Sequence, residues 1–297
     1  MRQYLLLLPL AVSLWQPVAA GEEASRPSPD PAPILHTQEV YKTVGASALK
    51  IDIFRPARAA ERENNIAIVF FHGGGWGFGA PSEFFSTCEH YAKLGIVAFS
   101  VEYRLSIENG ATPHPSISPI ESVMDAKSAM RWVRANVARF HLASDKIVAA
   151  GQSAGGHLAL CTAMIADHDE ATDNVAVSCR PDALLLFSAC VNAVEGWCDR
   201  LLGARRSQIW SISPAHHVRS GLPPMIAFHG TFDDQVPIWT LQFFREEMEK
   251  AGNRFELHRY EGRRHYLGAG NPRYAEYFDD DILRLADAFL RSHRLLE

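Results

Sequence analysis

Short runs that are almost wholly apolar recur along this chain of 297 residues, and they alternate with longer stretches that have the period of helices. A strand that is apolar on both faces is buried on both faces, as the central strands of a parallel sheet are. The sequence therefore predicts an α/β fold, a mostly parallel eight-stranded sheet with helices on both faces. The predicted strands are His36–Val44, Leu49–Phe54, Ile66–Phe71, Ile96–Val101, Ile147–Ala150, Ala183–Phe187, Met225–Phe228 and Phe255–Tyr260. The predicted helices are Glu83–Leu94, Ile120–Val137, Ala154–Ala166, Ile238–Ala251 and Tyr274–Leu296.

The first twenty residues have the pattern of an export signal. Arg2 is followed by an apolar run from Tyr4 to Trp15 and then by Val18-Ala19-Ala20, a small-residue pattern that a signal peptidase cuts. A retained membrane anchor is the alternative, but prolines 9 and 17 break the apolar run, which is shorter than the roughly 20 residues that span a bilayer. We expect cleavage after Ala20 and a secreted or periplasmic protein.

The rest of the chain has the composition of one soluble domain. Residues 21–35 are rich in Pro, Ser and Glu, which predicts a flexible mature N-terminus. Residues 36–297 are predicted to form a single α/β domain, since 47% of the chain is hydrophobic and 21% is charged. The net charge is −5 and the Lys and Arg residues are scattered, so we expect no nucleic-acid partner and no stable membrane association. The sequence indicates no oligomeric state.

Five cysteines leave two interpretations open. An odd count leaves at least one free thiol, while Cys190 and Cys198 are close enough in sequence for a disulfide to close a small loop. Buried free thiols that pack as small apolar groups are the alternative. No pair has the C-x-x-C spacing of a zinc or redox site, so no metal is predicted.

A glycine-rich turn joins the predicted strand Ile147–Ala150 to the helix that follows it. It reads Gly151-Gln152-Ser153-Ala154-Gly155-Gly156. A strand-to-helix turn this tight crowds its neighbours, so the residues around the serine must be small. The turn exposes Ser153 as a nucleophile, and it places the amide of Ala154 at a helix N-terminus, where it can stabilise an anion. The alternative is a serine that merely caps the helix.

A second glycine-rich turn, His72-Gly73-Gly74-Gly75-Trp76, follows the strand Ile66–Phe71. Without Cβ atoms, its backbone amides can approach a ligand closely. We predict that the amides of Gly73 and Gly74 stabilise an oxyanion together with that of Ala154. The segment from Gly75 to Ala80 also matches a dinucleotide-binding pattern, but two aromatic side chains inside that turn would block a pyrophosphate, so no cofactor is predicted.

An acid and a base are predicted downstream of the serine. Asp233 and Asp234 both follow the strand Met225–Phe228, and the spacing does not separate them. His265 lies in a loop with flanking glycines, after the last predicted strand and before the last helix. This is where the base must enter if the chain order is serine, acid, histidine. The combination predicts acyl transfer through a covalent serine intermediate.

These motifs, together with Tyr103-Arg104-Leu105 and the segment from His229 to Pro237, resemble the α/β-hydrolase superfamily. The closest resemblance is to the esterases related to hormone-sensitive lipase and to the microbial acetyl (xylan) esterases. The resemblance implies that Ser153 is the nucleophile, that Asp233 rather than Asp234 is the acid, and that His265 is the base. We also expect contacts to substrate from the residues Trp76 and Tyr103.

Two departures from that family bear on the substrate. No helical cap precedes the first strand, and the one internal stretch with room for a lid is Ser188–Pro223. We therefore expect little or no cap and an open site, suited to short acyl esters such as acetyl groups on a small molecule or a polysaccharide. The alternatives are a serine peptidase of the prolyl-oligopeptidase type, which normally adds a propeller domain, and a binding protein on an inactive hydrolase scaffold.

Overall fold

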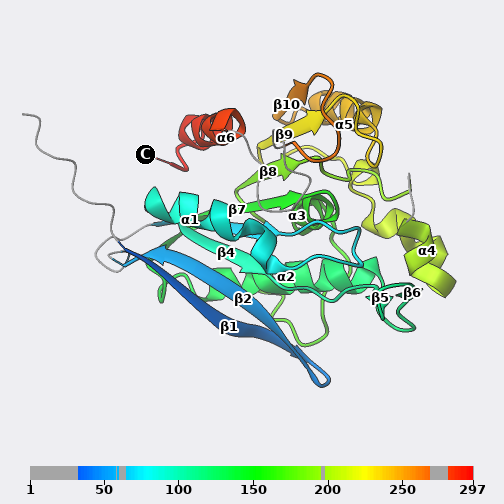
Figure 1. The fold of residues 1–297 in the computed structure, drawn as a ribbon, viewed down its shortest axis with the longest axis horizontal. Helices are drawn as coiled ribbons and strands as arrows, with labels where there is room; N and C mark the ends of the chain where they lie inside the picture. Colours follow the sequence, from blue (N-terminus) through cyan, green and yellow to red (C-terminus); the bar gives the residue numbers. More distant parts are fainter. Residues whose placement is uncertain (1–32, 58, 60–64, 195–197, 268–279, 297) are drawn as a thin grey trace, which may run out of the picture. The chain divides into compact units, whose positions relative to one another are not determined.

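The computed structural model describes residues 33–57, 59, 65–194, 198–267 and 280–296, and its main sheet has eight strands in the order β1-β2-β4-β3-β7-β8-β9-β10 (Figure 1). Neighbouring strands from β4 to β10 pair in parallel, and β2 is antiparallel to both of its neighbours. The predicted fold class is confirmed. The strands are β1 Ile34–Val44, β2 Ser47–Pro56, β3 Asn65–Phe71, β4 Val97–Val101, β7 Leu142–Gln152, β8 Ala183–Phe187, β9 Met225–Gly230 and β10 Phe255–Tyr260.

Side chains on the central strands alternate between two apolar layers, as the period of a strand requires. In β3, Ala67, Val69 and Phe71 belong to a core that also contains residues of α2, α3 and α5. Ile68 and Phe70 belong to a second core with residues of α1 and α6. Helices therefore cover both faces. Their bounds are α1 Phe85–Lys93, α2 Pro119–Ala135, α3 Ala154–Met164, α4 Cys198–Leu202, α5 Ile238–Lys250 and α6 Asp280–Ser292.

Several boundaries differ from those predicted. The strand predicted at Ile147–Ala150 begins earlier, at Leu142. Its first residues are partly exposed and lie next to a shift in the pairing register with β3, so they lack the apolar pattern on which the prediction depended. Within the last predicted helix, Tyr274–Leu296, α6 covers Asp280–Ser292, and residues 274–279 lie outside the described residues. A short strand pair, β5 Ile107–Glu108 and β6 Thr112–Pro113, was not predicted. The predicted signal peptide, residues 1–20, and nearly all of the predicted flexible segment, 21–35, lie outside the described residues.

The stretch with room for a lid contains only short helices in its described part. It holds α4 and two 3₁₀ helices, Gly203–Ile212 and Pro214–His216. All five cysteines of the chain are free thiols in the structure, including Cys190 and Cys198. In the part of the chain that is described, no helix is long and apolar enough to cross a membrane.

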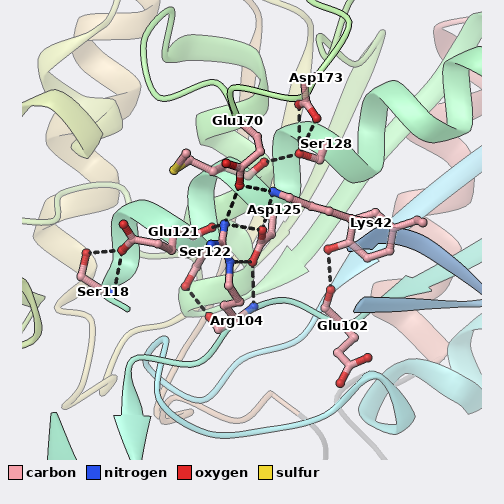
Figure 2. Close-up of polar contacts among 12 residues, drawn as sticks. Lys42, Glu102, Arg104, Ser118, Glu121, Ser122, Asp125, Ser128, Glu170 and Asp173 are labelled. Carbon is pink, nitrogen blue, oxygen red and sulfur yellow. Dashed lines mark hydrogen bonds and ion pairs between the residues drawn. The ribbon is translucent and has the colours of Figure 1, made fainter. Parts of the chain in front are cut away.

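A buried ionic cluster fastens α2 to the sheet and to the loop after α3 (Figure 2). Asp125 of α2 accepts from Lys42 Nζ of β1 at 2.7 Å and from the guanidinium of Arg104 at 2.7 and 2.8 Å. Both cations also reach Glu170, at 2.8 and 2.9 Å. Two positive and two negative groups thus neutralise each other away from water. We call these four residues the ionic cluster.

Candidate active site

The turn between β7 and α3 holds Ser153 in a strained backbone conformation, with φ 54° and ψ −119°. Such positive φ values are rare for residues with a side chain, and they persist where the surroundings enforce them. The enforcement is visible here: the amide of Ser153 donates to the carbonyl of Phe187 at 2.9 Å, and the amide of Cys190 donates to the carbonyl of Ser153 at 3.1 Å. The serine is therefore fixed to the end of β8.

The small residues around Ser153 are required by contact. A Cβ atom on Gly151 would overlap the carbonyl of Gly155, and a Cβ on Gly155 would overlap the carbonyl of Phe71 at the end of β3. At Gly156, a Cβ would collide with Ala189. The turn is thus packed backbone against backbone, which explains the glycine pattern predicted from the sequence.

Three backbone amides are available to bind an oxyanion next to Ser153. Ala154 is the first residue of α3, so its amide has no acceptor within the helix. Gly74 and Gly75, both with positive φ, line the same cavity as Ser153 and Ala154. Among the described residues, no turn or loop hydrogen bond uses the amide of either glycine. The structure thus favours Gly74, Gly75 and Ala154 as the oxyanion donors.

Gly73, which the sequence suggested in place of Gly75, is not among the residues that line the cavity. A Cβ atom on Gly73 would overlap the side chain of Gln152, and its carbonyl accepts from Tyr103 Oη at 3.1 Å. The glycine run alone could not show which two of its three amides face the serine. The choice depends on the side chains packed behind the run.

Tyr103 supports this glycine turn and does not line the cavity, contrary to the expected substrate contact. The single proton of its hydroxyl is shared in a bifurcated hydrogen bond between the carbonyls of His72 and Gly73, at 2.9 and 3.1 Å. Its ring stacks on that of His72 at 4.2 Å between centroids. Burial lowers the pKa of His72 to about 4, against a smaller opposing effect of its hydrogen bond to the Gly73 carbonyl. The histidine is therefore neutral at pH 7, and it braces the turn as an uncharged group.

Trp76 lines the cavity, and its orientation is fixed from behind. Its indole Nε1 donates to His157 Nδ1 at 3.1 Å, and the other ring nitrogen of His157 bonds the carbonyl of Ile212 at 2.6 Å. Because that carbonyl can only accept, His157 carries its proton on Nε2. This chain of bonds ties the glycine turn to α3 and to the segment after α4.

The structure brings Asp233 and His265 together. His265 Nδ1 lies 2.8 Å from Asp233 Oδ2, and both side chains are almost fully buried. The other carboxylate oxygen accepts from the amides of Gln235 and Val236 at 2.9 and 2.8 Å. With Nδ1 directed at the carboxylate, Nε2 of His265 is the nitrogen left for the serine. Ser153 and His265 both line the cavity, but within the described part of the chain they make no hydrogen bond to each other. In enzymes without substrate, the bond between nucleophile and base is often too long to count as a hydrogen bond and shortens when substrate binds.

A second histidine holds the carboxylate of Asp233. His229 Nε2 lies 3.2 Å from Asp233 Oδ2 and 2.7 Å from the carbonyl of Val236, so this nitrogen must carry a proton. Burial alone would raise the pKa of Asp233, but hydrogen bonds from His229, His265 and the Val236 amide outweigh it and hold that pKa well below its ordinary value. Asp233 is therefore ionised at any working pH.

Asp234, the alternative acid, is exposed, and it pairs with Arg264 at 3.3 Å. Spacing could not separate the two aspartates, whereas burial and contact with His265 distinguish Asp233. Asp234 and Arg264 thus form a surface ion pair, and this contact assigns neither residue a role in the reaction.

The cavity in front of Ser153 has a volume of about 230 Å³. Residues from five parts of the chain line it. Among the described residues, no group of His, Cys, Asp and Glu side chains has an arrangement that could hold a metal ion. Its lining residues are Gly74, Gly75, Trp76, Phe78, Gln152, Ser153, Ala154, Cys190, Asn192, Cys198, Gln235, Val236, Pro237, Thr240, His265 and Tyr266.

Comparison with known proteins agrees with this geometry. The BD-FAE family model matches residues 51–248, which is most of the chain. The chain belongs to the BD-FAE family. Solved structures of esterase 2 from Thermogutta terrifontis are similar over nearly their whole length: the form with propionate bound is 40% identical with a TM-score of 0.79, covering 88% of this chain and 95% of that one. The form phosphorylated by paraoxon has the same identity and a TM-score of 0.78, covering 88% and 95%.

A more distant relative is the probable isoprenylcysteine α-carbonyl methylesterase ICMEL1 of Arabidopsis thaliana, 25% identical over 240 residues. The alignment covers 73% of this chain and 48% of that protein, so the chain spans about half the length of this curated relative. Together, the comparisons place this BD-FAE member among the esterases of the α/β-hydrolase superfamily. The resemblance predicted from the motifs is confirmed.

Proposed function

We propose that this protein is an exported serine carboxylesterase that hydrolyses short acyl esters, acetyl esters above all. The observation that carries the proposal is the buried pair of Asp233 and His265 on the same cavity as the strained Ser153 and three backbone amides. A hydroxyl, a base with a fixed tautomer and a set of oxyanion donors are the parts that acyl transfer needs.

In the proposed mechanism, Ser153 Oγ attacks the ester carbonyl while His265 Nε2 accepts the hydroxyl proton. The developing oxyanion is stabilised by the amides of Gly74, Gly75 and Ala154. The carboxylate of Asp233 stabilises the imidazolium through the Nδ1 bond of 2.8 Å. His265 then protonates the departing alcohol, and water attacks the acyl-enzyme with the same histidine as base, which returns the serine and releases the acid.

The preference for short acyl groups is supported by the size of the cavity. Its volume of about 230 Å³ is below the range of roughly 300–1,000 Å³ that is usual for ligand pockets. The ring of Trp76, fixed by His157, supplies one rigid wall. Solved structures of the Thermogutta esterase 2 include propionate-bound and butyrate-bound forms, which fits small acids in a related site.

The mechanism is tested by comparing p-nitrophenyl acetate, butyrate and decanoate as substrates of the wild type and of Ser153→Ala. We expect fast acetate cleavage, slower cleavage of the longer esters, and a loss of about 10⁶-fold in kcat without the serine. Paraoxon should add one phosphoryl group to the wild type and none to Ser153→Ala, as mass spectrometry would show. Turnover that does not depend on Ser153 would overturn the mechanism.

Export and a polysaccharide substrate are the further parts of the proposal. Export is supported by the apolar run and the Val18-Ala19-Ala20 pattern of the N-terminus. N-terminal sequencing of the protein from its native cell should give Gly21 as the first residue; an intact Met1 would contradict cleavage of the signal after Ala20. Release of acetate from acetylated xylan tests the substrate, and cleavage of small acetates without any action on the polymer would limit the function to small esters.

A further inference from the structure

Neutral polar groups line the cavity in front of Ser153. No Lys, Arg, Asp or Glu side chain is among its described lining residues, whereas three carboxamides are: Gln152, Asn192 and Gln235. A carboxamide binds uncharged oxygen atoms through hydrogen bonds, with its NH₂ group as donor. The lining therefore favours a substrate with neutral oxygen atoms over one that carries charge.

Asn192 is the carboxamide whose orientation the structure fixes. Its Oδ1 accepts from the backbone amide of Val194 at 3.1 Å and from Ser213 Oγ at 3.2 Å. A backbone N–H can only donate, so the oxygen end of the side chain must face Val194, and the two ends cannot be exchanged. The nitrogen end, Nδ2, makes no hydrogen bond within the described part of the chain, and the residue lines the cavity.

The partners of Asn192 are themselves fixed. Ser213 is fully buried, and its Oγ accepts from the amide of Ala193 at 3.0 Å and lies 2.9 Å from His216 Nδ1. Two residues before Asn192, the amide of Cys190 donates to the carbonyl of Ser153. The segment that carries the carboxamide is therefore attached directly to the nucleophile turn, which is the arrangement of a preorganised binding group.

We propose that Asn192 is a specificity-determining residue whose Nδ2 donates a hydrogen bond to an oxygen atom on the alcohol part of the ester. The inference rests on the proposed function. An acetyl group has no hydrogen-bonding atom besides its carbonyl oxygen, which the oxyanion amides bind, so this donor pairs with the alcohol part. Esters of hydroxylated rings, such as acetylated sugars, are then preferred over esters of apolar alcohols of the same size.

The test uses two acetates with six-membered rings, a monoacetylated methyl β-xyloside and cyclohexyl acetate, with acetate release as the readout. Asn192→Leu keeps the approximate volume and removes the donor. We expect kcat/KM to fall about tenfold on the xyloside, the effect of about one neutral hydrogen bond, and less than about twofold on cyclohexyl acetate. The wild type should prefer the xyloside.

Two control variants separate recognition from loosening of the fold. Asn174 makes the same turn outside the cavity, with its Oδ1 accepting from the amide two residues on, Ala176, at 3.1 Å. Asn174→Leu should leave both kcat/KM values unchanged. Ser213→Ala removes one bond that orients Asn192 but keeps the donor, so it should lower the preference for the xyloside less than Asn192→Leu does.

Equal losses on the two acetates in Asn192→Leu, or no loss on the xyloside, would overturn the proposal while the esterase function stood. A wild type without preference for the xyloside would overturn it as well. If the wild type hydrolysed neither these acetates nor p-nitrophenyl acetate, the proposed function itself would fail and the inference with it. Melting temperatures of all variants identify any loss that comes from unfolding.

Discussion

Two carboxylates of this protein are equally buried and have opposite kinds of partner. The side chains of Asp125 in the ionic cluster and Asp233 in the candidate site are both fully shielded from solvent. Asp125 meets two permanent cations, Lys42 and Arg104 (Figure 2). Asp233 instead meets two histidines and two backbone amides.

The difference separates a structural carboxylate from one suited to catalysis. Lysine and arginine keep their protons across the working pH range, so the ionic cluster has nothing to transfer and acts by holding α2 against β1. Histidine gains and loses a proton near neutrality, so the partner of Asp233 can change charge during a reaction while the carboxylate stays ionised. Burial alone therefore does not mark a catalytic acid; the identity of its partner does.

The largest effect that follows from this comparison is loss of turnover in Asp233→Asn. The amide cannot hold the Nδ1–H tautomer of His265 or stabilise its positive charge, so kcat should fall by about 10⁴-fold. Asp234→Asn is the matched control, because that exposed residue pairs with the surface residue Arg264, and its kcat should stay within about twofold of the wild type. Esterase kinetics on p-nitrophenyl acetate measure both. Similar losses in the two variants would contradict the assignment of the acid.

For Asp125→Asn we expect lower stability and unchanged turnover. It leaves Lys42 and Arg104 with one carboxylate between them, and breaking a buried pair of this kind costs about 3–5 kcal/mol of the free energy of unfolding. Denaturant unfolding measures that loss, while kcat per folded molecule should remain near that of the wild type. If Asp125→Asn lowered kcat as strongly as Asp233→Asn does, the division between the two carboxylates would fail.

The sequence was sufficient for the fold and for the residue types of the site, and contacts explain where it fell short. Apolar runs predicted the central strands because such strands have no solvent face, and the glycines around Ser153 predicted a turn without room for Cβ atoms. The choice between Gly73 and Gly75 depends on Gln152 and Tyr103, which pack against Gly73 from segments far away in sequence. Such long-range packing leaves no local pattern to read.

Tyr103 connects the two regions, because its neighbour Arg104 belongs to the ionic cluster. Tyr103→Phe removes the bifurcated hydrogen bond that holds the carbonyls of the glycine turn, so we expect kcat to fall about tenfold with little change in KM, as for an interaction that matters in the transition state. Tyr41→Phe is the control: it loses one bond to the Glu102 carbonyl, 2.7 Å long, and should lower stability without lowering kcat. Equal kcat in the two variants would mean that the turn needs no such support.

The pH dependence of stability distinguishes the buried histidines from Asp233. Burial lowers the pKa of His157 to about 4, against a smaller opposing effect of its bond to Ile212, while an unfolded histidine has a pKa of about 6.5. The stability from the neutral ring is therefore complete above pH 6.5 and is lost as the pH falls toward 4, by about 1.4 kcal/mol per unit.

Asp233 has the same sign but a lower window: its folded pKa lies below that of an unfolded aspartate, about 3.9, and its contribution is lost only as the pH falls below that unfolded value. Between pH 6.5 and 4, acid sensitivity should thus come from the histidines. Replacing the ring in His157→Gln removes one titrating group, so the variant, although less stable at pH 7.5, should lose less stability than the wild type between pH 7.5 and 5. Unfolding curves at the two pH values give the comparison. Equal losses in both proteins would show that folding does not lower the pKa of His157.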